Sequence, residues 1–237
     1  MYRKIVIKLT GHLLDPSEDY DELISLINFI KNDHITNNRI YYIVVGGGGY
    51  ARILIENLRK HGVNEYLLDK IGIETSRIHA LFISYLLRPH VHEHIPRSIE
   101  EAVLLDMSKE ANLVMGGLYP GFSTNAVSAM LAKAINADVL LTMSRGGGLF
   151  DKNPEKHPDA KLIKEADISV VDEILGIYDE RAGHYPLLDK TSIKVIRENR
   201  INTYIIPPTL QALRKILNNE NPGTHITFES QRLTKQE

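Results

Sequence analysis

Four consecutive glycines, Gly46 to Gly49, follow an apolar segment at positions 40–45 and precede a helical pattern. Glycine reaches backbone angles that other residues avoid, and it lets main-chain N–H groups approach an anion directly. A helix that starts after such a loop adds the positive end of its dipole, and Arg52 is expected in the first turn. These residues predict a cradle for a phosphate or another oxyanion, although the same glycines also suit a tight strand-to-helix turn.

Three more turns of a similar kind occur along the chain. Lys8 ends an apolar segment and is followed by Gly11, a glycine-bearing turn spans 115–126, and another spans 144–154. Loops that leave the carboxyl ends of parallel strands converge on one edge of a sheet, where ligands bind. A lysine at that edge, with backbone donors from several loops, suits two adjacent phosphates. The plainer interpretation of Lys8 is a solvated lysine at a strand end.

The elements that must position these turns alternate between strand and helix patterns. This alternation predicts an α/β fold with a largely parallel sheet covered by helices. The expected strands cover residues 5–9, 40–45, 112–115, 138–142 and 203–206. The expected helices begin near residues 15, 51, 69, 124, 191 and 210. Asp15 is expected to cap the first helix, and Gly62 to end the second.

Composition narrows the class of protein. The chain has 237 residues, of which 43% are hydrophobic and 24% charged, and these values suit one large globular domain. It contains no cysteine, which excludes disulfides and thiolate chemistry. Its net charge of −2 and its scattered lysines and arginines do not favour a nucleic-acid partner or an anionic membrane surface. Without a membrane-spanning run or a secretory signal, a cytoplasmic location is expected.

Taken in order, the motifs resemble those of the amino acid kinase superfamily, and most closely the archaeal type of UMP kinase. The resemblance runs from Ile5 to about Ile226. Besides the turns above, it includes the segments 69–72 with 77–80, 151–162, 183–189 and 222–226. So many motifs in the right order make the resemblance specific.

The resemblance implies a three-layer αβα sandwich with a largely parallel central sheet. Residues 1–228 would form this domain, with an acceptor-binding part at about 1–135 and an ATP-binding part at about 136–228, followed by a polar tail at 229–237. It also implies a hexamer built from dimers. The implied activity is the phosphorylation of UMP to UDP by ATP with Mg²⁺.

The resemblance also assigns site residues by position. Lys8 and Gly11 would contact the transferred phosphoryl group. The residues that would bind the UMP phosphate and line its pocket are Gly46, Gly47, Arg52, Asp69, Gly117 and Thr124. Asp69 would accept from the ribose hydroxyls, although a helix cap is its plainer role. The residues that would border the ATP base and ribose are Phe150, Asp151 and Pro154.

The chain departs from the family pattern where charge matters. His12 replaces a small hydroxyl residue, and Thr10 adds a β-branched side chain beside the expected phosphate. Asn125 replaces the aspartate that orients the phosphate-binding lysine, and an amide cannot supply its negative charge. In the ATP-binding turn, Gly147 replaces an acidic residue and Arg145 replaces an asparagine. Arg145 is either a solvated loop residue or a new cation near ATP.

Further departures are Gly49, where the archaeal family often has lysine, and His79, which replaces an asparagine. Phosphoryl transfer depends on positioning and on charge compensation, and losing one orienting contact costs on the order of 10²-fold in rate. We therefore expect the fold to be retained and the activity to be weak.

Three histidines, His90, His92 and His94, alternate in a segment that has a proline at each end. Alternate residues of an extended segment share a face, and three imidazoles on one face could bind Zn²⁺. The plainer interpretation is a polar loop or a subunit contact, because nothing else in the sequence completes the coordination shell.

These observations support three hypotheses of function. The leading one is a UMP-kinase-like nucleotide-binding protein that transfers phosphate slowly. The second is a non-catalytic protein that binds or stores a metal or an oxyanion such as molybdate, suggested by Asn125, Gly147 and the histidines. The third is a regulatory subunit of a kinase encoded elsewhere. In each case the expected partner is a small nucleotide or oxyanion, and the chain is expected to form a homo-oligomer.

Overall fold

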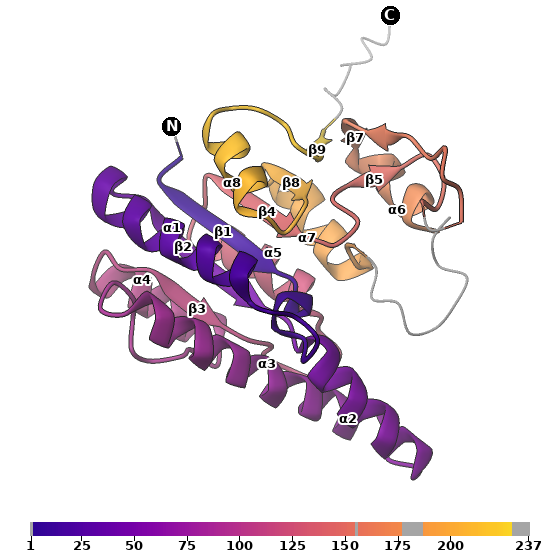
Figure 1. Cartoon of the computed structure of the whole chain (residues 1–237), viewed down its shortest axis with the longest axis horizontal. Coiled ribbons are helices and arrows are strands. Elements are labelled where there is room, and N and C mark those ends of the chain that lie inside the picture. The colour runs from indigo at the N-terminus through magenta and orange to yellow at the C-terminus, as the bar shows by residue number, and fades with distance from the viewer. Residues whose placement is uncertain (1, 155, 177–186, 229–237) are drawn as a thin grey trace, which may run out of the picture.

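In a computed structural model of the chain, the described residues are 2–154, 156–176 and 187–228, and they contain a central seven-stranded sheet (Figure 1). The strand order across it is β3 (Leu113–Met115), β2 (Ile40–Val45), β1 (Lys4–Leu9), β4 (Val139–Met143), β8 (Thr203–Ile206), β9 (Thr224–Thr227) and β7 (Glu165–Asp167). All neighbouring pairs are parallel except β8 with β9. The predicted α/β fold with a largely parallel sheet is confirmed.

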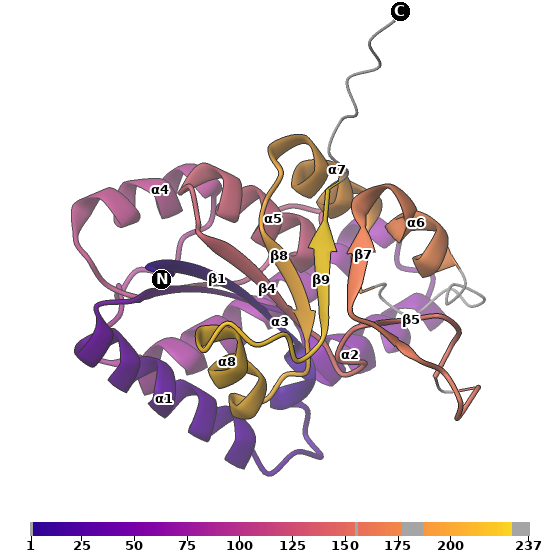
Figure 2. The same cartoon turned by 90° about the horizontal axis from the view of Figure 1, so that it is seen from above.

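Helices cover both faces of the sheet and make it the middle of three layers (Figure 2). One layer packs against Ile5 and Ile7 of β1 and consists of α1 (Asp21–Asn37), α3 (Glu65–Leu87) and α8 (Leu210–Leu217). The other packs against Val6 and consists of α4 (Ile99–Ser108), α5 (Thr124–Ala134), α6 (Ile168–Gly176) and α7 (Lys190–Asn199). A further helix, α2 (Gly48–Lys60), packs on α3. The three-layer αβα prediction is thus confirmed.

The central strands are apolar because both of their faces are covered. Every residue of β2 is buried, as expected for a parallel strand between two helical layers. Among the described residues, no helix combines the length and the apolar character that crossing a membrane needs.

The first helix begins later than the sequence predicts. After β1 the chain forms a short 3₁₀ turn, η1 (Gly11–Leu14), and α1 starts at Asp21. Asp15 therefore does not cap this helix, because its carboxylate accepts a hydrogen bond from the N–H of Gly49 in α2 instead. Gly62 follows the end of α2 with a φ of 75°, which confirms its predicted role.

Several elements lie outside the predicted set. The ribbon of β5 (Leu149–Phe150) with β6 (Leu162–Ile163) and the two last strands of the sheet, β9 and β7, have only two to four residues each, too few for a periodic signal. The helices α4 and α6 were also not predicted. In contrast, α3 starts earlier than predicted, because the side chain of Asn64 accepts from the N–H of Leu67 and caps it. The predicted tail at 229–237 lies outside the described residues.

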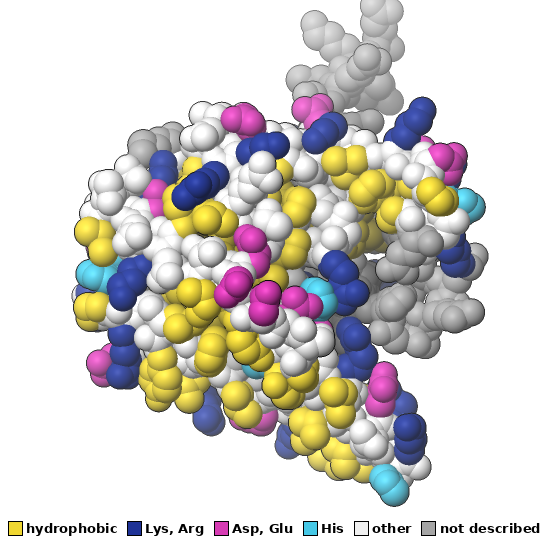
Figure 3. All heavy atoms as spheres, viewed as in Figure 1, with side chains coloured by type: hydrophobic (Ala, Val, Ile, Leu, Met, Phe, Trp, Pro, Cys, Tyr) yellow, Lys and Arg dark blue, Asp and Glu magenta, His cyan; other side chains and the backbone are white. Residues whose placement is uncertain are grey.

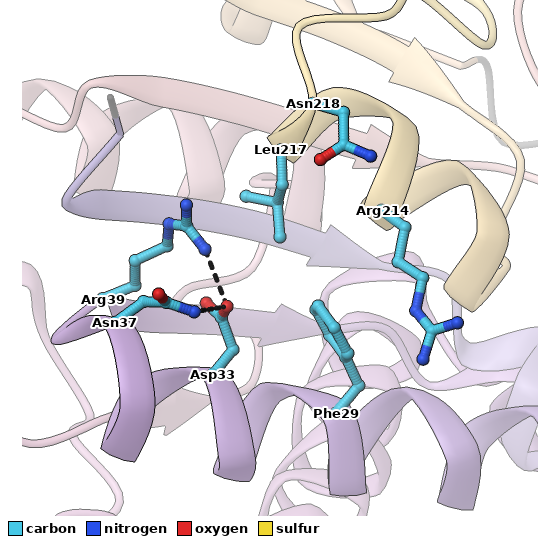
Figure 4. A pocket seen from close by; sticks show the side chains of 7 residues that line it. All are labelled: Phe29, Asp33, Asn37, Arg39, Arg214, Leu217 and Asn218. Carbon is cyan, nitrogen blue, oxygen red and sulfur yellow. Dashed lines mark hydrogen bonds and ion pairs between the residues drawn. The ribbon is translucent and has the colours of Figure 1, made fainter.

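A cavity of about 460 Å³ lies between α1 and α8, at the edge of the sheet opposite the glycine run (Figure 4). Arg39, which precedes β2, donates to the Asp33 carboxylate over 2.7 Å. The same carboxylate accepts from Asn37 and from the hydroxyl of Tyr41. These polar groups bond to one another and tie α1 to the start of β2, so the cavity belongs to the scaffold rather than to the site described next.

Candidate active site

The loops that follow β1 and β2 are in direct backbone contact at the carboxyl edge of the sheet. A Cβ atom on Gly11 would lie 2.3 Å from the nitrogen of Gly48 and 2.5 Å from the oxygen of Gly46, so no side chain fits there. A Cβ atom on Gly46 would in turn lie 3.6 Å from Oγ1 of Thr124, at the start of α5. The structure therefore brings together three predicted site residues, Gly11, Gly46 and Thr124.

The glycine run presents backbone N–H groups at the start of α2. Gly48 has a φ of 58°, and Gly47 precedes the helix without a side-chain cap. Within the described residues, the N–H groups of Gly47 and Gly48 donate no hydrogen bond, whereas Gly49 donates to Asp15. Two donors at this helix terminus are thus available to an anion and a third is already used. Arg52 is exposed, one residue beyond the first turn of α2.

Side chains of α3 bond to the backbones of the loops on the acceptor side. The buried His79 lies with Nδ1 2.8 Å from the carbonyl oxygen of the first glycine of the run. Ser76 accepts from the N–H of Gly117 over 2.7 Å, and Asp69 accepts from the N–H of Gly121 over 2.7 Å. Asp69 and Gly117, both predicted to line the UMP pocket, therefore lie on one wall that α3 holds in place.

Lys8 lies at the same edge, flanked in register by Val44 of β2 and Thr142 of β4. Burial lowers the pKa of Lys8 to about 8, while the negative charge of Asp189 acts in the opposite direction. The hydroxyl of Thr142 is buried and has no hydrogen-bond partner among the residues that the structure describes. A lysine whose charge is only partly compensated can bind an arriving phosphate strongly.

Asp189 joins the starts of two helices next to this lysine. It caps α7 by accepting from the N–H groups of Thr191 and Ser192, and it accepts from the hydroxyl of Ser123, which caps α5. Asn125 is buried in the first turn of the same α5. Asp189 was not among the predicted site residues. An aspartate just before a helical pattern was the available signal, but it indicates a cap and not a partner for Lys8.

The turn after β4 requires a backbone conformation that favours glycine at one position. Gly147 has a φ of 71°, and a Cβ atom there would lie 3.0 Å from Cγ of Pro207. The conformation favours glycine at the position where the family pattern has an acidic residue. Phe150 lies in β5, and Asp151 accepts from a backbone N–H just before β6 over 2.8 Å, which closes this ribbon. Pro154 is half-buried in the loop that follows.

Two residues that depart from the family pattern meet between the loops after β1 and β4. Nδ1 of His12 lies 3.4 Å from Nη2 of Arg145 and 2.9 Å from Oδ2 of Asp15. Nε2 of His12 lies 3.2 Å from Oε1 of Glu18. In the sequence, His12 and Arg145 are two separate departures from the family pattern, and only the fold shows that they are in contact.

The three clustered histidines occupy separate environments. His94 pairs with Glu101 over 3.0 Å, and the ring of His90 lies 5.9 Å from that of His34. His92 is buried, and burial lowers its pKa. In residues 2–154, 156–176 and 187–228, no group of three or more His, Asp or Glu side chains is arranged to hold a metal ion. The geometry therefore does not bring the three histidines together as the predicted Zn²⁺ site.

Comparison with known sequences gives matches over most of the chain. Residues 3–207 match the amino acid kinase family. The uridylate kinase of Methanobrevibacter smithii is 34% identical over 224 residues, which cover 94% of this chain and 98% of that protein. The uridylate kinase of Sulfurisphaera tokodaii is 35% identical over 215 residues, which cover 90% of this chain and 93% of that protein.

Solved structures agree with these matches. The uridylate kinase from Archaeoglobus fulgidus superposes with a TM-score of 0.82 at 27% identity, covering 96% of this chain and 100% of that one. The UMP kinase from Bacillus anthracis superposes with a TM-score of 0.78 over 97% of both chains, and at 20% identity this likeness shows the fold alone. With its sheet order, its glycine turns and these matches, the chain belongs to the amino acid kinase family.

Proposed function

We propose that the chain binds UMP and ATP and slowly transfers the terminal phosphoryl group of ATP to UMP. The observation that carries this proposal is the buried Lys8 at the edge where Gly11 and the glycine run are in backbone contact. This edge combines one cation with backbone donors, which is the chemistry that two neighbouring phosphates need. The archaeal relatives at 34–35% identity are uridylate kinases, which supports the same pair of substrates.

In this reaction a phosphate oxygen of UMP forms a bond to the terminal phosphorus of ATP. The bond from that phosphorus to the bridging oxygen of the departing ADP breaks, and the products are UDP and ADP. The protein needs to align the two nucleotides and to compensate the charge on the transferred group. Lys8 supplies the positive charge, and the N–H groups of Gly47 and Gly48 supply directed donors.

The acceptor nucleotide would bind on the side that α3 holds. Its phosphate would take the two available N–H groups at the start of α2, with Arg52 as the side-chain cation. Asp69, already fixed by the N–H of Gly121, would accept from the ribose hydroxyls. Gly117 and Thr124 would line the remainder of this pocket.

We attribute the slow rate to the neutral side chain of Asn125, which is buried in the first turn of α5. The resemblance implies an aspartate at this position that orients the lysine, and an amide has no negative charge with which to orient an ammonium. Separately, burial lowers the pKa of Lys8 to about 8. A neutral amine does not compensate phosphate charge, so a part of the population would be inactive at alkaline pH.

Mg²⁺ would enter this site with the nucleotide. The ion keeps several of its waters and binds through phosphates with only one or two carboxylates, so a cage of protein ligands is not required. Asp189 is the acidic residue whose charge acts on Lys8, and it would be the protein ligand of the ion beside its contacts with Ser123, Thr191 and Ser192. When bound, the metal neutralises negative charge on the phosphates.

We also propose that the chain forms a homo-oligomer. Figure 3 shows hydrophobic side chains gathered over α2 and α3 on the lower part of the molecule. The exposed apolar residues of these two helices are Tyr50, Ile53, Leu54, Tyr66, Leu67, Ile78, Leu81, Phe82 and Tyr85. Apolar surface of this extent marks an interface. Light scattering tests this point, and Ile78→Asp should reduce the measured mass.

The proposed activity is tested by measuring UDP formation from ATP, Mg²⁺ and UMP, with CMP, GMP and AMP as alternative acceptors. Lys8→Ala serves as the background, because it removes the cation and leaves the backbone donors in place. UDP formation well above this background supports the proposal. A wild-type rate equal to that of Lys8→Ala with every acceptor overturns it.

A further inference from the structure

Two cation-bearing side chains that depart from the family pattern meet at the edge that carries Lys8. His12 follows β1 and Arg145 follows β4, and these neighbouring strands place Lys8 opposite Thr142. Nδ1 of His12 lies 3.4 Å from Nη2 of Arg145, so two loops that are 133 residues apart are in contact. The contact lies between the β1 loop, which packs on the acceptor-side glycines, and the β4 loop of the donor side.

Both ring nitrogens of His12 face carboxylates. Nδ1 lies 2.9 Å from Asp15 and Nε2 lies 3.2 Å from Glu18. The two contacts lie on opposite sides of the ring and fix its orientation. Asp15 is itself 9% exposed and accepts from the N–H of Gly49. The ring is therefore held by a buried anchor.

Arg145 differs from His12 because it faces no carboxylate of the described ranges. It is exposed, and it forms no ion pair with any residue of these ranges. Its guanidinium lies 3.4 Å from Nδ1 of His12, which places it beside the anchored ring. The positive charge of Arg145 is therefore available to an arriving anion. The planar fork of a guanidinium matches the oxygens of a phosphate.

We propose that Arg145, positioned by His12 and Asp15, binds the terminal phosphate of the donor nucleotide. The phosphate that must lie between the β1 and β4 loops is the one passed from the donor side to the acceptor side. The identity of the donor as a nucleoside triphosphate rests on the proposed function. Arg145 would thus supply positive charge at a site where the family pattern has an asparagine.

Equilibrium titration of the full chain with ATP and with ADP, each with Mg²⁺, tests this inference. Arg145→Ala should weaken ATP binding about tenfold or more, the effect of losing one charge-assisted hydrogen bond, and should change ADP binding less than about twofold. His12→Ser should reduce the preference for ATP by a smaller factor, about threefold, because it only positions the guanidinium. Arg97→Ala, which removes an exposed guanidinium elsewhere, is the matched control and should change neither affinity.

Equal losses of ATP and ADP affinity in Arg145→Ala, or no loss of either, overturn the inference. A wild-type chain that binds neither nucleotide overturns it together with the proposed function. The two remain distinguishable when UDP formation is measured in parallel. If the wild-type chain forms UDP but Arg145→Ala keeps the wild-type ratio of ATP to ADP affinity, the inference alone is overturned. A preference for ATP that depends on Arg145, without UDP formation, overturns the proposed activity alone.

Discussion

The predicted acceptor side and the predicted donor side of the site are held together differently. On the acceptor side, three side chains of α3 (His79, Ser76 and Asp69) bond to backbone groups of the loops after β2 and β3. On the donor side, the turn after β4 is closed by its own backbone, because the N–H of Gly147 donates to the carbonyl of Ser144, and Gly147 packs against Pro207. Side chains of a neighbouring helix therefore hold the loops of the first region, whereas the turn of the second is closed by its own backbone.

This difference shows that shape and charge can change separately in one site. The departures from the family pattern at Asn125, Gly147 and Arg145 alter the charge around the donor and the lysine. None of them changes the course of the sheet or the glycine contacts, which depend on backbone conformation. The fold is thus retained, and we expect the electrostatics of transfer to differ from the family pattern.

The largest effect on the rate of UDP formation is expected from Lys8, which would contact the transferred phosphoryl group. Lys8→Ala should reduce the rate of UDP formation on the order of 10²- to 10³-fold, because it removes the cation that compensates the transferred group. Steady-state kinetics measure this, with the thermal unfolding midpoint as the check on folding. Lys4→Ala at the other end of β1 is the matched control, since its ammonium pairs with Asp106 away from the site. Equal effects of the two substitutions would contradict the role of Lys8.

The second largest effect is expected at the contact between the loop after β1 and the glycine run. Gly11→Ala would place a Cβ atom 2.3 Å from the backbone of Gly48, and we expect a loss of about 3 kcal/mol in the free energy of unfolding. Gly62→Ala tests backbone strain alone, because Gly62 has a φ of 75° and open space around its Cβ position. Its expected cost is about 1 kcal/mol.

Chemical denaturation measures both free energies. If Gly11→Ala costs no more than Gly62→Ala, the loops separate readily and their contact does not define the site. A larger cost for Gly11→Ala, with activity lost in the folded fraction, supports a rigid junction between the loop after β1 and the glycine run.

Much of this architecture could be predicted from the sequence, because it rests on local patterns. The apolar run 40–45 became a fully buried central strand, and the glycines after it became the start of a helix. Asp15 shows where such patterns fail. Asp-Pro is a good helix start locally, but a partner 34 residues away, Gly49, took the carboxylate. A contact of this kind has no signal in the neighbouring residues.

Gly147 gives a second example of what sequence comparison leaves out. Against the family pattern it is a lost acidic residue, and restoring an aspartate would be expected to recover activity. Its φ of 71° shows that the turn now favours glycine, so an aspartate there would strain the backbone. Asp189 is the converse case, because its role beside Lys8 arises from the meeting of α5 and α7 and not from its sequence context.

A smaller effect is expected from a substitution that affects one side only. His79→Ala removes the hydrogen bond to the carbonyl of Gly46 and should raise the KM for UMP about threefold to tenfold, with the KM for ATP unchanged. Gly147→Ala on the donor side should show the reverse pattern, since the strain lies in the donor turn. The pair of KM values for each variant measures this. A rise in both KM values for either variant would show that the two sides are coupled.

The smallest expected effect is the pH dependence of UDP formation, which follows the charge of Lys8. It is slight near neutral pH and grows as the pH rises. A lysine whose pKa is about 8 is protonated below that pH and neutral above it. Because the cation is the active form, UDP formation should be constant at pH 6–7 and should decline as the pH passes through about 8. Asn125→Asp adds a negative charge near Lys8, raises its pKa and moves the decline to higher pH.

Asp189→Asn should move the same decline in the opposite direction, because it removes the carboxylate that raises the pKa of Lys8. The two variants separate an electrostatic role from a structural one. Loss of the α5 and α7 caps would lower the unfolding midpoint without moving the pH at which activity falls. Opposite shifts of the pH profile, with the two chains still folded, would show that charge near the lysine sets the rate. Identical profiles for wild type and both variants would show instead that another group limits the reaction at alkaline pH.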